Sequence, residues 1–343
     1  MIKVRGLVAW RVALLTVLIA AIAAGGWLWY DWARFARSPL AVPGPGQSIE
    51  VARGMSFKDI VGALRERGIT RNSDLYWRAL AFQMQASGRL HAGEYALRAG
   101  MTPRDLIGDM ANGKVLQRYF TIVDGWSFAD LRRALDAVPT IDHDLADVDT
   151  TELMKRLGTE GEDPEGRFLP ETYAYVKGDK ESAILKRARA AMDKFLYGAW
   201  PGRAKDLPLA SPYEALILAS IVEKETGRAD ERPRIAGVFV RRLEQRMLLQ
   251  TDPSVIYGMG ASYTGNIHKS DLTTDTPYNT YTRVGLPPTP IALPGRPAIL
   301  AALHPADGKE LYFVARGDGS HVFSATLDEH NRAVACYQLK RCK

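Results

Sequence analysis

Residues 211–260 decide how this chain is organised, and they read SPYEALILASIVEKETGRADERPRIAGVFVRRLEQRMLLQTDPSVIYGMG. Ser211 can cap a helix and Pro212 suits the first helical position. The apolar run at 215–222 predicts a helix that is buried all round, in the centre of a domain. Gly227 offers a stop for this helix. We therefore expect a domain built around one central helix.

Two glutamates lie in the last turn of this predicted helix. A carboxyl group there is partly desolvated and faces the negative end of the helix dipole, and both effects raise its pKa, as a general acid requires. At about 100° per residue, Glu225 shares a face with Ile221 and Val222, whereas Glu223 points roughly 160° away. The helix alone cannot pair the two carboxylates, and solvation at a fraying helix end is the alternative for either.

Three long strings carry a family resemblance: ASIVEKET at 219–226, LQTDPSVIYG at 249–258, and YNTY at 278–281 with GLPP at 285–288. They resemble the MltG (YceG-like) family of endolytic murein transglycosylases. The resemblance runs from the N-terminal apolar segment almost to the C-terminus. In that family the catalytic glutamate is the second of the Glu-Lys-Glu-Thr string, which is Glu225 here. The helix-face argument favours the same residue.

The first 30 residues predict a membrane anchor. Residues 1–11 are short and basic, and residues 12–30 are uncharged and almost wholly apolar. As a helix they span roughly 28 Å, close to the hydrocarbon thickness of a bilayer. A cleaved signal peptide is the alternative, but the apolar run continues past a possible cleavage site at 21–23. The basic flank places the N-terminus in the cytoplasm and the body outside, at the inner (plasma) membrane.

The predicted fold class is α+β: an N-terminal transmembrane helix, a LysM-like αβ subdomain and a helix-centred lytic transglycosylase catalytic domain. A string G-[MW]-[ST]-x-x-D-[IL] recurs at 54–60, 100–106 and 125–131, and each copy predicts a turn followed by a capped helix. The family resemblance implies that the first αβ unit is LysM-like and binds glycan or only acts as a scaffold. The predicted parts are a cytoplasmic segment 1–11, a membrane helix 12–30, a linker 31–47, the LysM-like unit 48–118, a connecting αβ segment 119–207, the catalytic domain 208–335 and a tail 336–343.

Candidate substrate-binding side chains lie in the family strings and near them. Sugar sites use aromatic faces and a few carboxylates, and Asn and Tyr side chains can bind hydroxyl and N-acetyl groups. Ordinary packing or capping is the alternative for these residues, and for Asp252 a structural or orienting role is favoured. The candidates are Glu223, Glu171, Tyr173, Gln250, Asp252, Tyr278, Asn279, Tyr281 and His321.

Several classes of protein are disfavoured by what the sequence lacks. The six histidines show no metal-ligand spacing such as H-E-x-x-H, and there is no P-loop, nucleotide fingerprint or nucleophile elbow. We therefore expect no metal and no organic cofactor. The net charge of +6 fits anionic lipid, peptidoglycan or nucleic acid equally, so charge alone selects no partner. Cys336 and Cys342 can pair in an oxidising compartment or stay free in a tail.

The resemblance implies an endolytic peptidoglycan lytic transglycosylase. Such an enzyme cleaves the β-1,4 bond between N-acetylmuramic acid and N-acetylglucosamine inside nascent strands, leaves a 1,6-anhydro end and terminates elongation. Its expected partners are glycan strands and peptidoglycan synthases, and no nucleic acid. Ordinary glycosidases need two carboxyl groups, whereas an internal hydroxyl nucleophile makes one enough, and no clear second carboxylate is evident. The alternatives are a muramidase using Asp252, Glu171 or Glu223, and a catalytically silent glycan-binding scaffold for cell-wall synthases.

Overall fold

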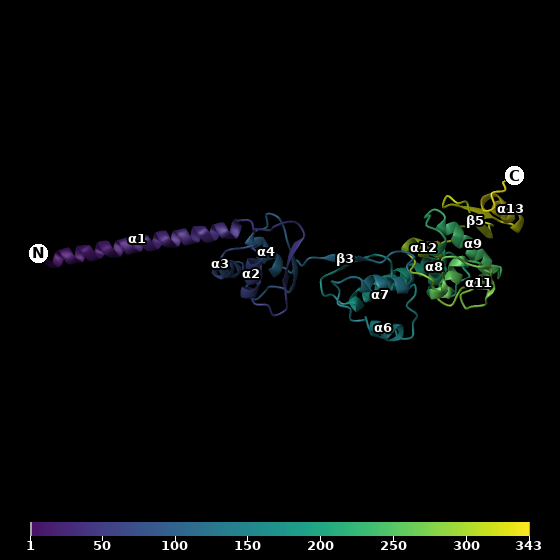
Figure 1. The fold of residues 1–343 in the computed structure, drawn as a ribbon, viewed down its shortest axis with the longest axis horizontal. Coiled ribbons are helices and arrows are strands. Elements are labelled where there is room, and N and C mark those ends of the chain that lie inside the picture. The colour runs from purple at the N-terminus through teal and green to yellow at the C-terminus, as the bar shows by residue number, and fades with distance from the viewer. Residues whose placement is uncertain (1, 343) are drawn as a thin grey trace. The chain divides into compact units, whose positions relative to one another are not determined.

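The structure is a computed structural model that describes residues 2–342, with side chains from residue 10 onward. It divides into two compact units, with the boundary between Arg118 and Tyr119. Helices and strands occur in both units, so the predicted mixture of α and β structure is confirmed. Figure 1 identifies the main elements by label.

The first helix is longer than the predicted membrane segment. α1 (Ile2–Arg37) is long and apolar enough from Trp10 onward to cross a membrane. Figure 1 shows it extending clear of the other helices of its unit. Its last turns are different, because Phe35 is buried against Tyr76 and Trp77. The linker predicted from residue 31 is therefore wrong up to Arg37, where packing against the first unit keeps the chain helical.

The rest of the first unit is a small αβ body with its own core. Ile49 and Tyr95 face each other across an antiparallel pair of strands, and Trp77 and Tyr95 are almost completely buried. The helices supply most of the other core residues. The elements in order are β1 (Gln47–Val51), α2 (Phe57–Glu66), α3 (Asp74–Gln83), β2 (Gly93–Leu97) and α4 (Pro103–Ala111).

The three repeated strings begin helices as predicted. Ser56, Thr102 and Ser127 cap α2, α4 and α5 (Phe128–Asp136), respectively. Each cap side chain accepts a hydrogen bond from the backbone N–H of the aspartate three residues on, and that aspartate accepts one from the cap backbone. Each box satisfies two N–H groups that the helix leaves open. The repeat is thus accounted for by the local chemistry of starting a helix.

The second unit begins with a mixed segment that has a separate core. β3 (Arg118–Thr121) pairs with β4 (Thr172–Tyr175). The core between this pair and the helices includes Leu131, Phe168 and Ile184. The helices of this segment are α5, α6 (Thr150–Leu157), α7 (Glu181–Ala199) and the short 3-10 helix η1 (Trp200–Gly202).

The predicted central helix is α8 (Pro212–Glu225), and its burial is confirmed. Every residue from 215 to 222 is buried. The one polar side chain in this run, Ser220, donates to Ile217 O (2.7 Å) and accepts from the backbone N–H of Ile291 (3.0 Å), so its burial is compensated. The elements that follow are α9 (Arg232–Glu244), α10 (Asp252–Met259), η2 (Gly260–Ser262), α11 (Lys269–Thr273), α12 (Arg296–Leu303), β5 (Tyr312–Ala315), β6 (His321–Ser324) and α13 (Leu327–Tyr337).

Three local expectations fail for identifiable reasons. α8 ends at Thr226 in extended backbone, without a left-handed glycine at 227. Arg242 of α9 is buried, although arginine is ordinarily exposed, because its guanidinium donates hydrogen bonds to the carbonyls of Leu249 (2.9 Å) and Leu311 (2.7 Å). The tail predicted from residue 336 begins within α13, and a disulfide joins Cys336 to Cys342.

A glycine in α9 allows close packing that a methyl group would block. A β-carbon at Gly237 would overlap the carbonyl oxygen of Ala306, whose own N–H donates to Pro233 O (2.8 Å). We expect Gly237→Ala to lower the free energy of unfolding of the second unit by about 1–3 kcal/mol.

The matched control is Gly198→Ala in α7, where nothing lies within 4 Å of the added carbon. This change is expected to be neutral or to stabilise by about 0.5 kcal/mol through helix propensity. Denaturant unfolding of both variants tests the difference, and equal effects would show that α9 can move away from the loop.

Candidate active site

A polar pocket of about 410 Å³ lies at the C-terminal end of α8. Its walls come from the end of α8, the segment before α10, the 278–281 loop, the β5–β6 hairpin and α13. The pocket brings together five of the residues predicted from sequence, Glu225, Gln250, Asp252, Tyr281 and His321.

Glu225 is the last residue of α8 and reaches this pocket. Burial raises the pKa of its carboxyl group to about 7, a hydrogen bond from Thr251 opposes the rise, and the charge of Asp252 adds to it. Such a group is partly protonated at neutral pH and can both give and take a proton. The chemistry expected of Glu225 is therefore available in the folded chain.

Thr251 holds the Glu225 carboxyl group in place. Its hydroxyl donates to Glu225 Oε1, and its own backbone N–H donates to Thr280 Oγ1 (3.0 Å). Ser254 Oγ donates to Thr251 O (2.9 Å) and lies 2.9 Å from Thr280 Oγ1. All three hydroxyl residues are buried, so this network fixes one carboxyl oxygen and leaves the other free to exchange a proton. Sequence reasoning missed Thr251, although it precedes Asp252 in a family string.

Two family strings meet beside Glu225. Gln250 has a left-handed backbone (φ 53°), and its N–H donates to Thr280 O (3.1 Å). The Tyr281 hydroxyl donates to Asp252 Oδ1, and burial raises the pKa of Tyr281 so that it stays a donor. Arg242, also missed by sequence reasoning, donates to Gln250 Oε1 (3.3 Å) at the pocket wall. These contacts preorganise several donors and acceptors around the acid.

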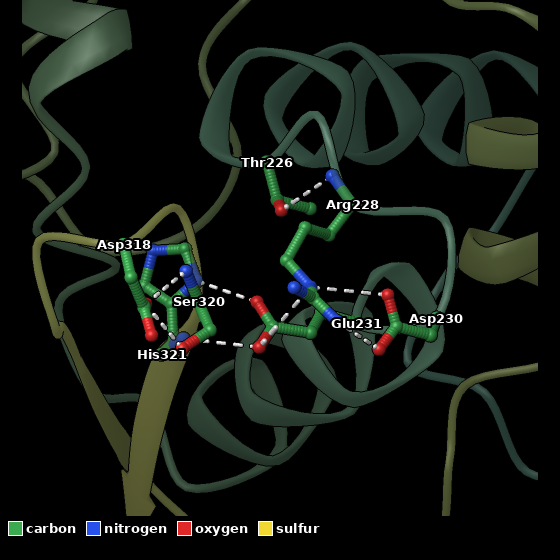
Figure 2. Close-up of polar contacts among 7 residues, drawn as sticks. All are labelled: Thr226, Arg228, Asp230, Glu231, Asp318, Ser320 and His321. Carbon is green, nitrogen blue, oxygen red and sulfur yellow. Dashed lines mark hydrogen bonds and ion pairs between the residues drawn. The ribbon is translucent and has the colours of Figure 1, made fainter.

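His321 enters the pocket from the start of β6 and is fixed by Glu231 at the start of α9. Glu231 Oε2 lies 2.7 Å from His321 Nδ1, and Oε1 accepts from the His321 backbone N–H (3.0 Å). Figure 2 shows this pair beside Arg228, which also faces Asp230. Burial works to raise the pKa of Glu231, but the hydrogen bonds from His321 outweigh it and lower the pKa. The hairpin is thereby held against α9.

The other two predicted carboxylates have partners outside this pocket lining. Glu223 forms an ion pair with Arg232 (3.1 Å) and accepts from the backbone N–H of Gly295 (3.0 Å), the cap of α12. Glu171 forms an ion pair with Arg296 (2.5 Å). Both contacts link elements of the second unit. A substrate role for either residue stays a prediction.

The remaining predicted residues also lie outside the pocket lining. Tyr173 is buried and donates to Leu169 O (2.7 Å), and the Tyr278 hydroxyl lies 2.9 Å from Thr289 Oγ1. Asn279 is buried, and its side-chain amide donates to three backbone carbonyls of residues 271–274. The contacts of Tyr278 and Asn279 shape the loop that carries Tyr281. Contact with substrate stays a prediction for all three.

A second carboxyl group shows that a raised pKa does not by itself define the site. Burial raises the pKa of Glu165 to about 7. It accepts from Phe128 N–H (3.0 Å) at the start of α5 and from the Tyr257 hydroxyl (3.1 Å). Glu165 fastens two elements and lies outside the pocket lining, so pocket access distinguishes Glu225 from it.

The fold and the pocket are those expected of an enzyme, with a candidate acid–base site built on one desolvated carboxyl group at the end of a buried helix. The chain belongs to the YceG-like family, whose model matches residues 49–336. The family resemblance predicted from the three strings is thereby confirmed.

Relatives of known structure or curated name agree with this assignment. An endolytic murein transglycosylase of Bacillus subtilis is 29% identical over 307 residues, which cover 84% of each chain. One of Streptococcus pneumoniae is 26% identical over 358 aligned positions, covering 93% of this chain and 63% of that relative. A crystal structure of a yceG-like protein from Listeria monocytogenes has 27% identity and a TM-score of 0.51, covering 84% of this chain and 98% of the other.

The raised pKa of Glu225 predicts that this residue costs stability. The carboxyl group titrates near its ordinary value of 4.5 in the unfolded chain and at about 7 in the folded chain, so folding takes up a proton between these pH values. The free energy of unfolding therefore falls as the pH rises through this window. We expect Glu225→Gln to stabilise the second unit above pH 7 by up to about 3 kcal/mol and to have little effect below pH 4.5.

The matched variant is Glu223→Gln, two residues away on the same helix. It removes the ion pair with Arg232, whose side chain is itself largely buried, so a loss of about 1–3 kcal/mol is expected at neutral pH. Thermal unfolding at pH 5 and pH 8 measures the change in stability of both variants. A Glu225→Gln variant that is less stable than the parent at pH 8 would contradict the burial argument.

Proposed function

We propose that this chain is a membrane-anchored endolytic lytic transglycosylase of peptidoglycan, with Glu225 as its acid and base. The observation that carries the proposal is the Glu225 carboxyl group with a pKa of about 7 in an open polar pocket. It occurs in a YceG-like chain whose relatives are named endolytic murein transglycosylases. The substrate is the β-1,4 bond between N-acetylmuramic acid and N-acetylglucosamine inside a glycan strand.

In the first step, protonated Glu225 donates its proton to the glycosidic oxygen as the bond to the muramyl anomeric carbon breaks. The N-acetylglucosamine side leaves as an alcohol, and positive charge develops on the muramyl ring. The carboxylate that remains is stabilised by the Thr251 hydroxyl and by the positive charge of Arg242. A group with a pKa near the working pH can release and regain the proton at comparable cost.

In the second step, the Glu225 carboxylate takes the proton from the C6 hydroxyl of the same muramyl residue. That oxygen attacks the anomeric carbon and closes a 1,6-anhydro ring, which leaves Glu225 protonated for the next cycle. No water is consumed, so a single carboxyl group completes the reaction. Gln250, Asp252, Tyr281 and His321 offer the polar contacts that orient the sugar rings.

A muramidase that uses water is the second candidate, and one observation favours it. The sequence shows no evident second carboxylate, but in the structure Asp252 lines the same pocket as Glu225. In an ordinary glycosidase a second carboxylate activates water or attacks the anomeric carbon. Asp252 also accepts a hydrogen bond from Tyr281. This contact fits the transglycosylase equally well, with Asp252 as a fixed negative charge that stabilises the muramyl cation. The chemical nature of the product end separates the two reactions.

The first unit indicates where in the cell the reaction takes place. We propose that α1 crosses the inner membrane once with the N-terminus in the cytoplasm, so that the catalytic unit acts on nascent strands outside and terminates their elongation. The long apolar helix and its exposed side chains support the anchor. Glycan binding by the LysM-like unit at 48–118 and association with peptidoglycan synthases stay predictions.

Digestion of purified sacculi by the full chain in detergent tests the reaction. We expect fragments with 1,6-anhydro ends from the parent, a loss of at least about 100-fold with Glu225→Gln, and retained activity with Glu223→Gln, because Glu223 lies outside the pocket lining. Mass spectrometry of the fragments identifies the ends.

Each other outcome supports a different function. Reducing ends that disappear with Asp252→Asn would support the muramidase. Binding to sacculi without any released fragment, from every version of the chain, would support the silent scaffold.

The contact between Thr251 and Glu225 predicts a change in the pH profile. The Thr251 hydroxyl favours the carboxylate form, so Thr251→Val is expected to raise the pKa of Glu225 further. The alkaline limb of kcat/KM, which reports loss of the protonated acid, should move to higher pH by roughly 0.5–1 unit, with a lower maximum because the carboxyl group loses its anchor. Thr264→Val, at an exposed threonine, should leave the profile unchanged. A shift of the Thr251→Val limb to lower pH would refute this role.

A further inference from the structure

A buried carboxylate outside the pocket lacks the partners that its burial demands. Glu181 is the first residue of α7 and is fully buried, and neither of its side-chain oxygens has a hydrogen-bond partner. The side-chain nitrogens beside it are Arg132 Nε at 3.5 Å from Oε1 and His143 Nδ1 at 3.8 Å from Oε2. Both are too distant for good hydrogen bonds. An isolated buried carboxylate is costly, so this position calls for a closer positive charge.

His143 presents a nitrogen lone pair to the same place. Its Nε2 lies 3.0 Å from the carbonyl oxygen of Val138. A carbonyl can only accept, so Nε2 carries the hydrogen, and Nδ1 of the neutral ring is left with a lone pair. Nδ1 is buried and has no hydrogen-bond partner. A histidine held through one nitrogen by a backbone carbonyl, with the other nitrogen open toward a carboxylate, is the arrangement of a metal ligand.

Asp136 completes a set of three ligands. It is the last residue of α5, and one ligand atom from each of Asp136, His143 and Glu181 lies within 4.8 Å of the others. The Asp136 side chain is exposed and can change its rotamer. Such a change can bring its carboxylate closer to the ligand atoms of His143 and Glu181, to the spacing of neighbouring ligands around a tetrahedral metal ion. A water molecule can then supply a fourth ligand.

The backbone holds these residues together without the help of an ion. On one side of His143, Asp142 N donates to Asp179 O (2.8 Å), and Glu181 N donates to Asp142 O (2.9 Å). On the other side, the Ser182 hydroxyl donates to Asp144 Oδ2 (2.7 Å). The loop that carries His143 is thus fastened to the start of α7 on both sides. The ligands are preorganised, which lowers the entropy cost of binding an ion.

We propose that Asp136, His143 and Glu181 bind one zinc ion. This ion would join the end of α5, the loop at 137–149 and the start of α7. An imidazole nitrogen with two carboxylates suits zinc, whereas calcium needs six or more oxygens. The local charge favours a bound cation, because the cluster has more acidic than basic side chains. The acidic side chains are Asp136, Asp144 and Glu181, and the basic ones are Arg132 and Lys180. Arg132 is drawn aside by a hydrogen bond to Leu145 O (2.9 Å). The ion is structural and takes no part in the chemistry at Glu225.

Zinc titration of the tag-free full chain in detergent, after removal of metal with a chelator, tests this site. We expect one zinc per chain by elemental analysis, and a rise in Tm of about 5 °C or more for the second unit when free zinc is 100-fold above Kd. Cobalt in place of zinc should give the visible absorption bands of a four-coordinate site with nitrogen and oxygen ligands. The cobalt spectrum needs no substitution, so it tests the proposal even if a variant fails to fold.

Variants assign the ion to these residues. His143→Ala and Glu181→Gln should each weaken zinc binding by at least about 10-fold and, at the same zinc concentration, reduce the zinc-dependent rise in Tm to about half or less. His304→Ala removes an exposed histidine at the end of α12 and should change neither. The proposal is overturned if the parent binds no stoichiometric zinc, or if His143→Ala binds as tightly as the parent. Arg132 would then be the charged partner of Glu181.

Discussion

The proposed active site depends on holding one carboxyl group desolvated at the end of a helix that is itself buried. α8 can end inside the protein only because the elements around it cover its sides and satisfy its last polar groups. Thr251 does this for Glu225, and Thr280 and Ser254 do it for Thr251. The family strings at 249–258 and 278–281 therefore serve one purpose. They carry the hydroxyl network that keeps the acid in place, and Asp252 and Tyr281 follow it into the pocket.

The sequence predicts well what is settled by neighbours along the chain. The buried run at 215–222 and the three capped helices are decided by residues within a few positions of one another, and all appear in the structure. The preference for Glu225 over Glu223 also has a local basis, since two positions on a helix point to different sides. The structure places Glu225 in the pocket and Glu223 at the cap of α12.

The sequence fails where distant segments decide the outcome. Arg242 is of a residue type that is ordinarily exposed, yet it is buried and donates to a backbone carbonyl 69 positions away in the sequence. Tyr281 lines the pocket and Tyr278 packs against the core, although both belong to one short string. No spacing rule could reveal Asp136, His143 and Glu181 as one cluster, because they come from a helix end, a loop and a helix start. Motifs for metal sites recognise ligands that share one element, and these do not.

Glu223 and Glu225, both in the last turn of α8, have surroundings that act on their charges in opposite ways. Glu223 meets a guanidinium and a helix N-terminus, so its charge is compensated and helps to join α8, α9 and α12. Glu225 is desolvated by burial, and the like charge of Asp252 adds to this effect, so its pKa is raised to about 7 although the Thr251 hydroxyl, His321 and Arg242 oppose the rise. A full ion pair at Glu225 would stabilise the fold, but it would lower the pKa and remove the proton that a general acid must give. Among the described residues Glu225 forms no ion pair, and the influence of Arg242 and His321 does not cancel the effect of burial, so the raised pKa that the proposed acid needs is kept.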